Sequence, residues 1–342
     1  MDEDTDILDE IAERPSTIRD DTVISVVGFP DDQSEKAKEL AEWIWGVLRV
    51  MDKIWDLQRL ERIVIGASLS DALAEIDIGY KSTTAKSFTS TGEIIAVGKM
   101  LNVQRDSGVR AVVAFSAAIL LPLLAEEGRA HSIAMYTLAH EMAHVAELHW
   151  RDEATPNILL NLDTVDWPPP SIRQTAITIW EEYSACRLAA AFGDEQYMTT
   201  LFASLYEDSA IAALPAAKAA IKQYRKHSVL QQLLAEAGPP VCLPLKCLGY
   251  LLGHLDGADI RDEVADICPK AQQSIYGPLV HTFRSSLQEI WGTKSSWKWP
   301  GMFESLSMAV LGAYRLAGMD YSQIPGGVYV KVPYTHDTMY GL

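Results

Sequence analysis

The sequence predicts an α+β fold whose C-terminal half is rich in helix. Between residues 22 and 115, short β-rich runs alternate with clusters of Gly, Ser, Thr and Asp, a pattern typical of strands and turns. From about residue 130 to 320 the apolar residues recur at helical spacing instead. The chain has 342 residues, of which 48% are hydrophobic, and this length predicts two folded domains or one large domain with an appendage. We therefore expect an acidic flexible tail over residues 1–20, an α+β domain over residues 21–192 and a mostly α-helical region over residues 193–342.

The elements of the α+β domain follow from changes in periodicity. Residues 22–29 are a short β-rich run ended by Pro30, which predicts an edge strand. Apolar residues at helical spacing then predict an amphipathic helix of about five turns over residues 37–55, with Ser34 as its N-cap. The β-rich runs that follow predict strands over residues 62–67, 92–97 and 109–115, and residues 70–79 are expected to form one helical stretch. Some connections look too short for crossover helices, so we expect a small, twisted, mostly antiparallel sheet.

The C-terminal region reads as a series of helices. Pro215 precedes the Ala-rich segment 216–220 and suits the first position of a helix. Residues 328–332 follow a Pro-Gly-Gly turn and predict one returning strand. Breaks between helices are expected at clusters of Gly, Pro and other turn residues, namely 168–170, 193–194, 238–240, 256–257 and 297–301.

Composition excludes several classes of function. The chain carries 29 Lys and Arg against 46 Asp and Glu, a formal net charge of −17, and such a surface repels phosphate, so no nucleic-acid partner is expected. The longest apolar run, residues 111–125, is shorter than the roughly 20 residues that a membrane-spanning helix needs. The N-terminus is acidic and lacks the apolar segment of a signal peptide, so we expect a soluble, cytoplasmic protein. The four cysteines are too few for a disulfide framework and are expected to be buried thiols: Cys186, Cys242, Cys247 and Cys268.

One segment dominates the functional interpretation: His140-Glu141-Met142-Ala143-His144. On a helix, residues four apart project from the same face, so His140 and His144 can bind one Zn²⁺ at about 2.0–2.1 Å. Glu141 lies beside them and can take a proton from a metal-bound water as general base. Apolar neighbours indicate a largely buried helix, in which histidines need partners. The pattern predicts a zinc site; the alternative is an accidental match in a purely helical interaction module.

A hydrolytic zinc site needs a third protein ligand. His149 follows His144 by five residues on the continuing helix, which rotates it about 140° away from the metal-binding face. A second helix offers carboxylates instead. Residues 171–174 have the pattern of a capping box, and the helix that they open carries Glu181 and Glu182.

These two motifs together resemble the gluzincin metallopeptidases, including the ImmA/IrrE-type and HtpX-type groups. In those families a His-Glu-x-x-His helix is followed by a helix with the pattern Glu-x-x-Ala-x-x-x-Ala, and the glutamate that opens the second pattern is the third zinc ligand. The resemblance implies a zincin-like catalytic domain over residues 21–192, with Glu182 as the third ligand and small residues at Ala185 and Ala189. Glu181 is the alternative ligand if the helix is rotated by one position. The families commonly have Asp or Asn where this chain has Cys186, so the group that orients the histidines is left open.

The resemblance implies a zinc-dependent metallopeptidase that hydrolyses peptide bonds of an intracellular protein or peptide, with Glu141 as the general base. A sheet edge would hold the extended peptide, and residues 92–97 and 109–115 are the candidate edge strands. The alternative is that either run is a central strand that packs the core. Candidates for stabilising the oxyanion or supporting the ligands are Tyr183, Arg187, His149 and His281; His281 lies in an apolar helix, where a core histidine is favoured. The alternative function is a zincin-fold, zinc-binding regulatory or defence protein with little or no hydrolysis.

Overall fold

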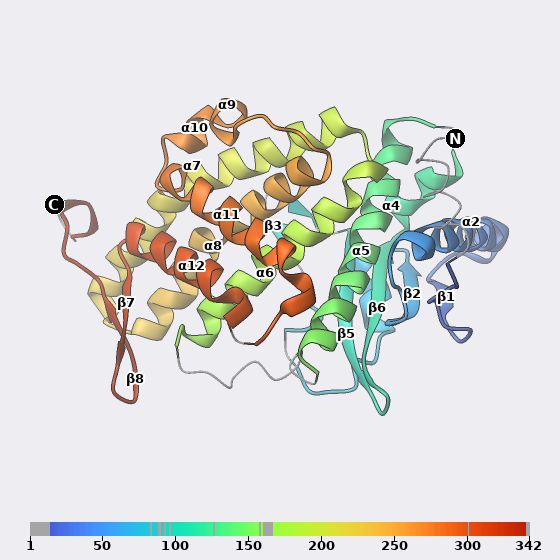
Figure 1. Cartoon of the computed structure of the whole chain (residues 1–342), viewed down its shortest axis with the longest axis horizontal. Helices are drawn as coiled ribbons and strands as arrows, with labels where there is room; N and C mark the ends of the chain where they lie inside the picture. Colours follow the sequence, from blue (N-terminus) through green and yellow to red (C-terminus); the bar gives the residue numbers. More distant parts are fainter. Residues whose placement is uncertain are drawn as a thin grey trace. The chain divides into compact units, whose positions relative to one another are not determined.

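The structure is a computed structural model that describes residues 14–82, 84–87, 90–91, 94–95, 97–125, 127–156, 159, 167–299 and 301–339. Its packing divides the chain into two compact units, Met1–Leu159 with Ala191–Asp194 and Leu160–Ala190 with Glu195–Leu342. The first unit holds a four-stranded sheet and the second holds most of the long helices (Figure 1). This division differs from the expected boundary after residue 192, because residues 167–190 pack with the second unit.

The sheet of the first unit has the strand order β1-β2-β6-β5. β1 pairs with β2 and β2 pairs with β6 in parallel, whereas β5 pairs with β6 in antiparallel register. The expectation of a mostly antiparallel sheet is therefore wrong, and the sheet is mixed. The long helix α2 (Ser34–Ile54) supplies the crossover that the parallel β1–β2 pair requires. The four strands are β1 (Val23–Val27), β2 (Leu60–Gly66), β6 (Gly108–Ser116) and β5 (Gly98–Arg105).

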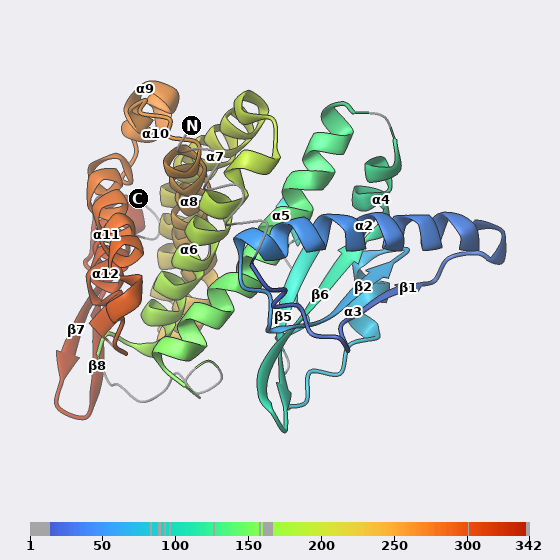
Figure 2. The ribbon, with the colours of Figure 1, turned by 45° about the vertical axis from the view of Figure 1, so that its right-hand side comes forward.

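Helices cover both faces of this sheet. Helix α3 (Leu69–Ala74) packs on the face that carries Val64, Val112 and Ala114. Because side chains alternate along a strand, Phe115 points to the opposite face, where helix α5 (Arg129–Ala154) passes close to β5 and β6. In Figure 2 the axis of α2 crosses the strands of this sheet. The apolar stripe predicted for α2 is confirmed, with four fully buried members in Leu40, Ile44, Leu48 and Met51.

Several local expectations for the first unit differ from the structure. Helix α2 begins at Ser34, and the Gln33 that precedes it makes no side-chain capping bond, so Ser34 is not the N-cap. The helical stretch expected over residues 70–79 is the shorter α3, which Ser68 and Asp71 cap by reciprocal hydrogen bonds.

The strand predictions near residue 100 need the largest revision. The run 92–97 lies partly outside the described residues, and within it β4 (Ile94–Ile95) pairs only with β3 (Ser90–Thr91). The run 109–115 is the core of β6, which lies between β2 and β5 and is not an edge strand. The sheet has two edge strands: β1, where the run 22–29 predicted one, and β5, which was not predicted. The sequence signal of β5 is the alternation of buried Leu101 and Val103 before the two-residue loop that joins Arg105 to Gly108.

The segment before β1 is tied to α2. Asp52 of α2 is only 4% exposed. Its carboxylate accepts hydrogen bonds from Ser16 Oγ at 2.6 Å and from the Thr17 amide at 2.9 Å. A buried carboxylate requires such donors, so the prediction of a flexible tail is wrong for these two residues. Residues 1–13 of that prediction lie outside the described residues.

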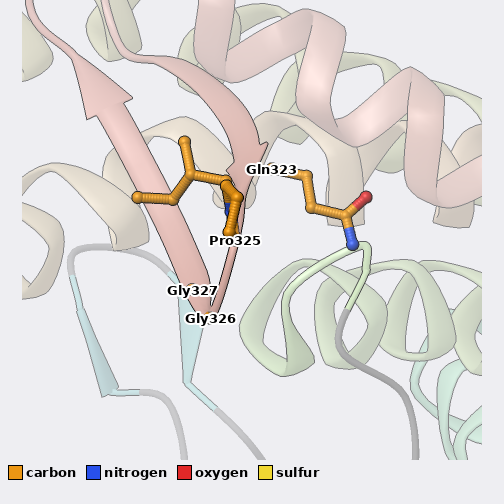
Figure 3. Close-up of a pocket in the computed structure, with 5 residues that line it drawn as sticks. Gln323, Pro325, Gly326 and Gly327 are labelled. Atoms are coloured by element: carbon orange, nitrogen blue, oxygen red, sulfur yellow. The ribbon is translucent and has the colours of Figure 1, made fainter.

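The second unit confirms the helix-rich C-terminal half. The returning strand expected over residues 328–332 is β8 (Gly327–Lys331), and its antiparallel partner β7 (Asp320–Ile324) was not predicted. Figure 3 shows the pocket at the β7–β8 turn, whose lining residues 323–327 include no titratable side chain. The helices are α6 (Pro170–Ala189), α7 (Glu195–His227), α8 (Leu230–Gly257), α9 (Val264–Ile267), α10 (Pro269–Gln272), α11 (Val280–Gly292) and α12 (Glu304–Leu316).

Two predicted helix boundaries are absent because buried helices continue through proline. Pro215 lies inside α7, and the cluster 238–240 lies inside α8 together with Pro244. Each internal proline costs a helix about 3 kcal/mol. The α8 side chains that become fully buried against neighbouring helices contribute about 1.5–3 kcal/mol each, which is enough to offset this cost. They include Leu233, Val241, Leu245, Leu248, Leu251, Leu252 and Leu255.

A glycine stripe on α8 brings α6 into the second unit. Gly249, Gly253 and Gly257 recur every four residues and face α6. A Cβ built on Gly253 would lie 2.2 Å from the Tyr183 carbonyl oxygen, so only glycine permits this approach. Helix α6 itself begins at Pro170 after Pro169, without a side-chain cap, so the predicted capping box at residues 171–174 is wrong. Proline at the first helical position serves instead.

Two further expectations concern the whole chain. Among the described helices, none combines the length and apolarity that crossing a membrane requires. None of the four cysteines, which all lie within the described residues, forms a disulfide; three are buried as expected, and Cys242 is half-buried beside the Tyr314 hydroxyl.

Candidate metal centre

The centre of the candidate site is a pair of histidines on α5. The Nε2 atoms of His140 and His144 lie 3.1 Å apart. Their rings are nearly perpendicular, at 88°, with centroids 4.7 Å apart. Both side chains are half-buried. Helix α5 continues without a break to Ala154, so the four-residue spacing places the two imidazoles one turn apart on the same face.

This pair fits a zinc ion by the chemistry and spacing of its donors. Two nitrogens bound to one tetrahedral Zn²⁺ at about 2.0–2.1 Å lie about 3.3 Å from each other. The observed 3.1 Å between His140 Nε2 and His144 Nε2 is close to that value. Neutral imidazole nitrogen is also a ligand that zinc prefers.

Two residues of α5 flank the pair. Glu141 is 7% exposed and lies on the side of α5 that faces β5 and Phe115. Tyr136, one turn before His140, is 4% exposed, and its ring stacks on the His140 ring at a centroid distance of 6.2 Å. Sequence reasoning did not single out Tyr136, although its four-residue spacing from His140 was an available signal.

Glu182 lies on α6 of the second unit and is 8% exposed. Its Oε1 is 2.9 Å from the Lys246 ammonium of α8. The carboxylate of Glu182 raises the pKa of Lys246 well above the usual lysine value, so this lysine stays charged. Glu181, the alternative ligand, is half-buried on the same helix.

Sequence reasoning missed Lys246. In the sequence between Glu236 and Asp256, Lys246 is the only residue of the types Lys, Arg, Asp and Glu. A single cation in such an apolar helix requires a buried partner, and this was the signal that could have found it.

Tyr183 and Arg187 take part in a network around Asp256, whose side chain is 5% exposed. The Tyr183 hydroxyl donates to Asp256 Oδ2 at 2.7 Å, and Arg187 Nη1 donates to the Tyr183 oxygen at 2.6 Å. Burial and the Asp256 carboxylate raise the pKa of Tyr183 far above its usual value. Arg284 donates to the other oxygen of Asp256 at 2.8 Å. These contacts give both oxyanion candidates a role in holding α6, α8 and α11 together.

The two remaining candidates lie in different surroundings. His149 is 6% exposed, and its ring nitrogens lie 3.1 and 3.2 Å from the Gln58 side-chain amide and 3.4 Å from Asp56. It therefore faces the segment before β2, which is consistent with its predicted rotation away from the metal-binding face of α5. His281 is exposed on α11, so its interpretation as a core histidine is wrong. The buried face of α11 is formed by Phe283, Leu287 and Ile290 instead.

Comparison with known proteins adds no relative: no family model, no curated protein and no solved structure matches the chain. The functional proposal therefore depends on the residues of this chain.

Proposed function

We propose that the chain is a zinc-dependent metallopeptidase of gluzincin type, with a zincin-like catalytic domain. The observation that carries the proposal is the pair of imidazole nitrogens 3.1 Å apart on α5, with the carboxylate of Glu141 next to His140 in the sequence. That combination supplies two zinc ligands and a general base on one helix.

Glu182 is proposed as the third ligand. His140, His144 and Glu182 each carry a donor atom that zinc accepts, and three protein ligands are usual for hydrolytic zinc. Lys246 engages Glu182 Oε1, and the second carboxylate oxygen can serve the metal because a carboxylate has two acceptor atoms. Lys246 would then hold the Glu182 carboxylate in a fixed orientation, as residues that contact metal ligands commonly do.

The chemistry follows from these groups. Zinc, when bound, acts as a Lewis acid that polarises the scissile carbonyl and makes a coordinated water acidic near neutral pH. Glu141 takes the proton of the attacking water and later gives it to the leaving amine. Its low exposure of 7% limits competing contact between the carboxylate and bulk water.

The proposed substrate is an extended segment of an intracellular protein or peptide. β5 is an edge strand. Its Gln104 amide donates to the Ile78 carbonyl, so the part of β5 before Gln104 is where an extended peptide can add by main-chain pairing. The Glu141 side chain approaches the first residue of β5. We place the reaction in the cytoplasm, where free thiols such as the four cysteines persist.

The variant Glu141→Gln tests the proposal. It should keep about one zinc per chain, because neither histidine changes, and it should lower turnover by about 10²- to 10⁴-fold, the usual contribution of a general base. The measurement is cleavage of a broad peptide library with and without a chelator, together with zinc analysis. Cleavage by E141Q at the wild-type rate would contradict the assignment of the base. Stoichiometric zinc without any cleavage by the wild type would favour a regulatory zinc protein.

A further inference from the structure

Gly98 lies where β5 meets α5. It is the first residue of β5 and pairs with Phe115 of β6. A Cβ built on Gly98 would lie 3.0 Å from Glu141 Cγ and 2.9 Å from two carbons of the Phe115 ring. Carbon atoms pack best at about 3.5–4.0 Å. A side chain at this position therefore requires its neighbours to move.

Of these two neighbours, Glu141 has the side chain that can move more easily. Phe115 is fully buried within the sheet, and a close-packed core resists displacement of a ring. Glu141 is 7% exposed and has a longer, more flexible side chain that can change rotamer. A methyl group at residue 98 would thus meet two contacts: the Phe115 ring at 2.9 Å, which resists displacement, and Glu141 Cγ at 3.0 Å, which can move by a change of rotamer and take its carboxylate with it.

We propose that Gly98 is a positioning residue, whose lack of a side chain determines where the Glu141 carboxylate lies. The consequence for catalysis rests on the proposed function, in which Glu141 is the general base. The backbone of Gly98 lies outside the left-handed region, so alanine can adopt it and the effect of the substitution is steric.

The chain offers a matched control in the same unit. Gly46 lies in α2, and a Cβ built on it meets no atom within 4 Å. Gly46→Ala therefore makes the same chemical change without a new contact. It should leave turnover and zinc content unchanged.

The kinetic test is a double-mutant cycle with the full chain. Gly98→Ala should lower kcat by about 10- to 100-fold, since small displacements of a catalytic group have effects of this size, while KM and zinc content stay unchanged. In the Glu141→Gln background the same substitution should cause no further loss, because Gly98 acts through Glu141. An unchanged kcat in G98A, or an equal loss in both backgrounds, would overturn the inference while leaving the proposed function intact. If G98A does not fold, G98A/F115L relieves the contact with the ring and keeps the contact with Glu141.

A second readout does not depend on activity. The side-chain carboxyl ¹³C resonance of Glu141, identified by its loss in E141Q, should move in G98A and stay in place in G46A. An unmoved resonance in G98A would overturn the inference, even in a chain that cleaves no peptide. Absence of cleavage by the wild type would instead count against the proposed function, and the resonance would still decide the role of Gly98.

Discussion

At the scale of single residues, Glu182 is the side chain whose role distinguishes the proposed metal centre from one in which Glu181 is the third ligand. It is buried and paired with Lys246, while its neighbour Glu181 is half-buried. Removal of a buried partner leaves the other charge uncompensated. A variant at Glu182 must therefore keep an acceptor for Lys246 if its effect on metal binding is to be distinguished from loss of the fold.

The variant Glu182→Gln meets that requirement. It keeps an oxygen for Lys246 but replaces the carboxylate with a neutral amide, so zinc content after dialysis should fall far below one per chain. Glu181→Ala is the matched control and should retain nearly all its zinc. Elemental analysis with circular dichroism makes the comparison. Loss from E181A alone would show that Glu181 is the ligand, and equal loss from both would indicate collapse of α6.

At the scale of elements, the α6–α8 pair depends on close backbone approach. Gly253→Ala would place a Cβ 2.2 Å from the Tyr183 carbonyl oxygen. Overpacking costs about 1–3 kcal/mol of unfolding free energy, and we expect the upper end because the contacted atom belongs to the backbone. Gly292→Ala in α11, where a Cβ meets nothing within 4 Å, should change the free energy by less than about 1 kcal/mol. Urea unfolding of both variants compares them; equal stability would contradict the packing argument.

The α7–α8 contact contains a buried histidine that predicts a pH dependence. His254 of α8 is 0% exposed, and its Nε2 lies 3.2 Å from both the Glu195 carbonyl oxygen and Thr199 Oγ1 of α7. Burial lowers the pKa of His254 below 6.5, so the unfolded chain binds the proton first as pH falls. Its contribution to stability is therefore complete above about pH 6.5 and is lost as pH falls toward the lowered pKa.

The matched variant for this prediction is His254→Gln, which keeps polar atoms but does not titrate. Urea unfolding should show the stability difference between wild type and H254Q shrinking from pH 7.5 to pH 5.5. A difference that stays constant over this range would mean that His254 does not cause the pH dependence.

At the scale of the whole molecule, the features that the sequence predicted best are local ones. The stripe of α2 and the helix around His140 and His144 follow from side-chain spacing within a single element. The parallel pairing of β2 with β1 and with β6 joins segments far apart in the chain, and spacing within each strand carries no information about its partner. The expected break at residues 238–240 failed for a related reason, because burial of α8 against other helices outweighs its local preference.

The candidate site was predictable to a similar degree. The His140–Glu141–His144 motif is contained within two helical turns, so its geometry followed from sequence. The contacts of Glu182 with Lys246 and of Gly98 with Glu141 depend on which helix packs on which element. His281 illustrates the same limit, since its apolar neighbours did not reveal which face of α11 is exposed.

The most direct test of the central claim is diffraction at the zinc absorption edge from crystals of the zinc-loaded chain. The proposed function predicts one anomalous peak, bonded to a nitrogen of His140, a nitrogen of His144 and a carboxylate oxygen of Glu182. Absence of a peak at the two histidines, or a peak there with no bond to Glu182, would contradict the proposed metal centre.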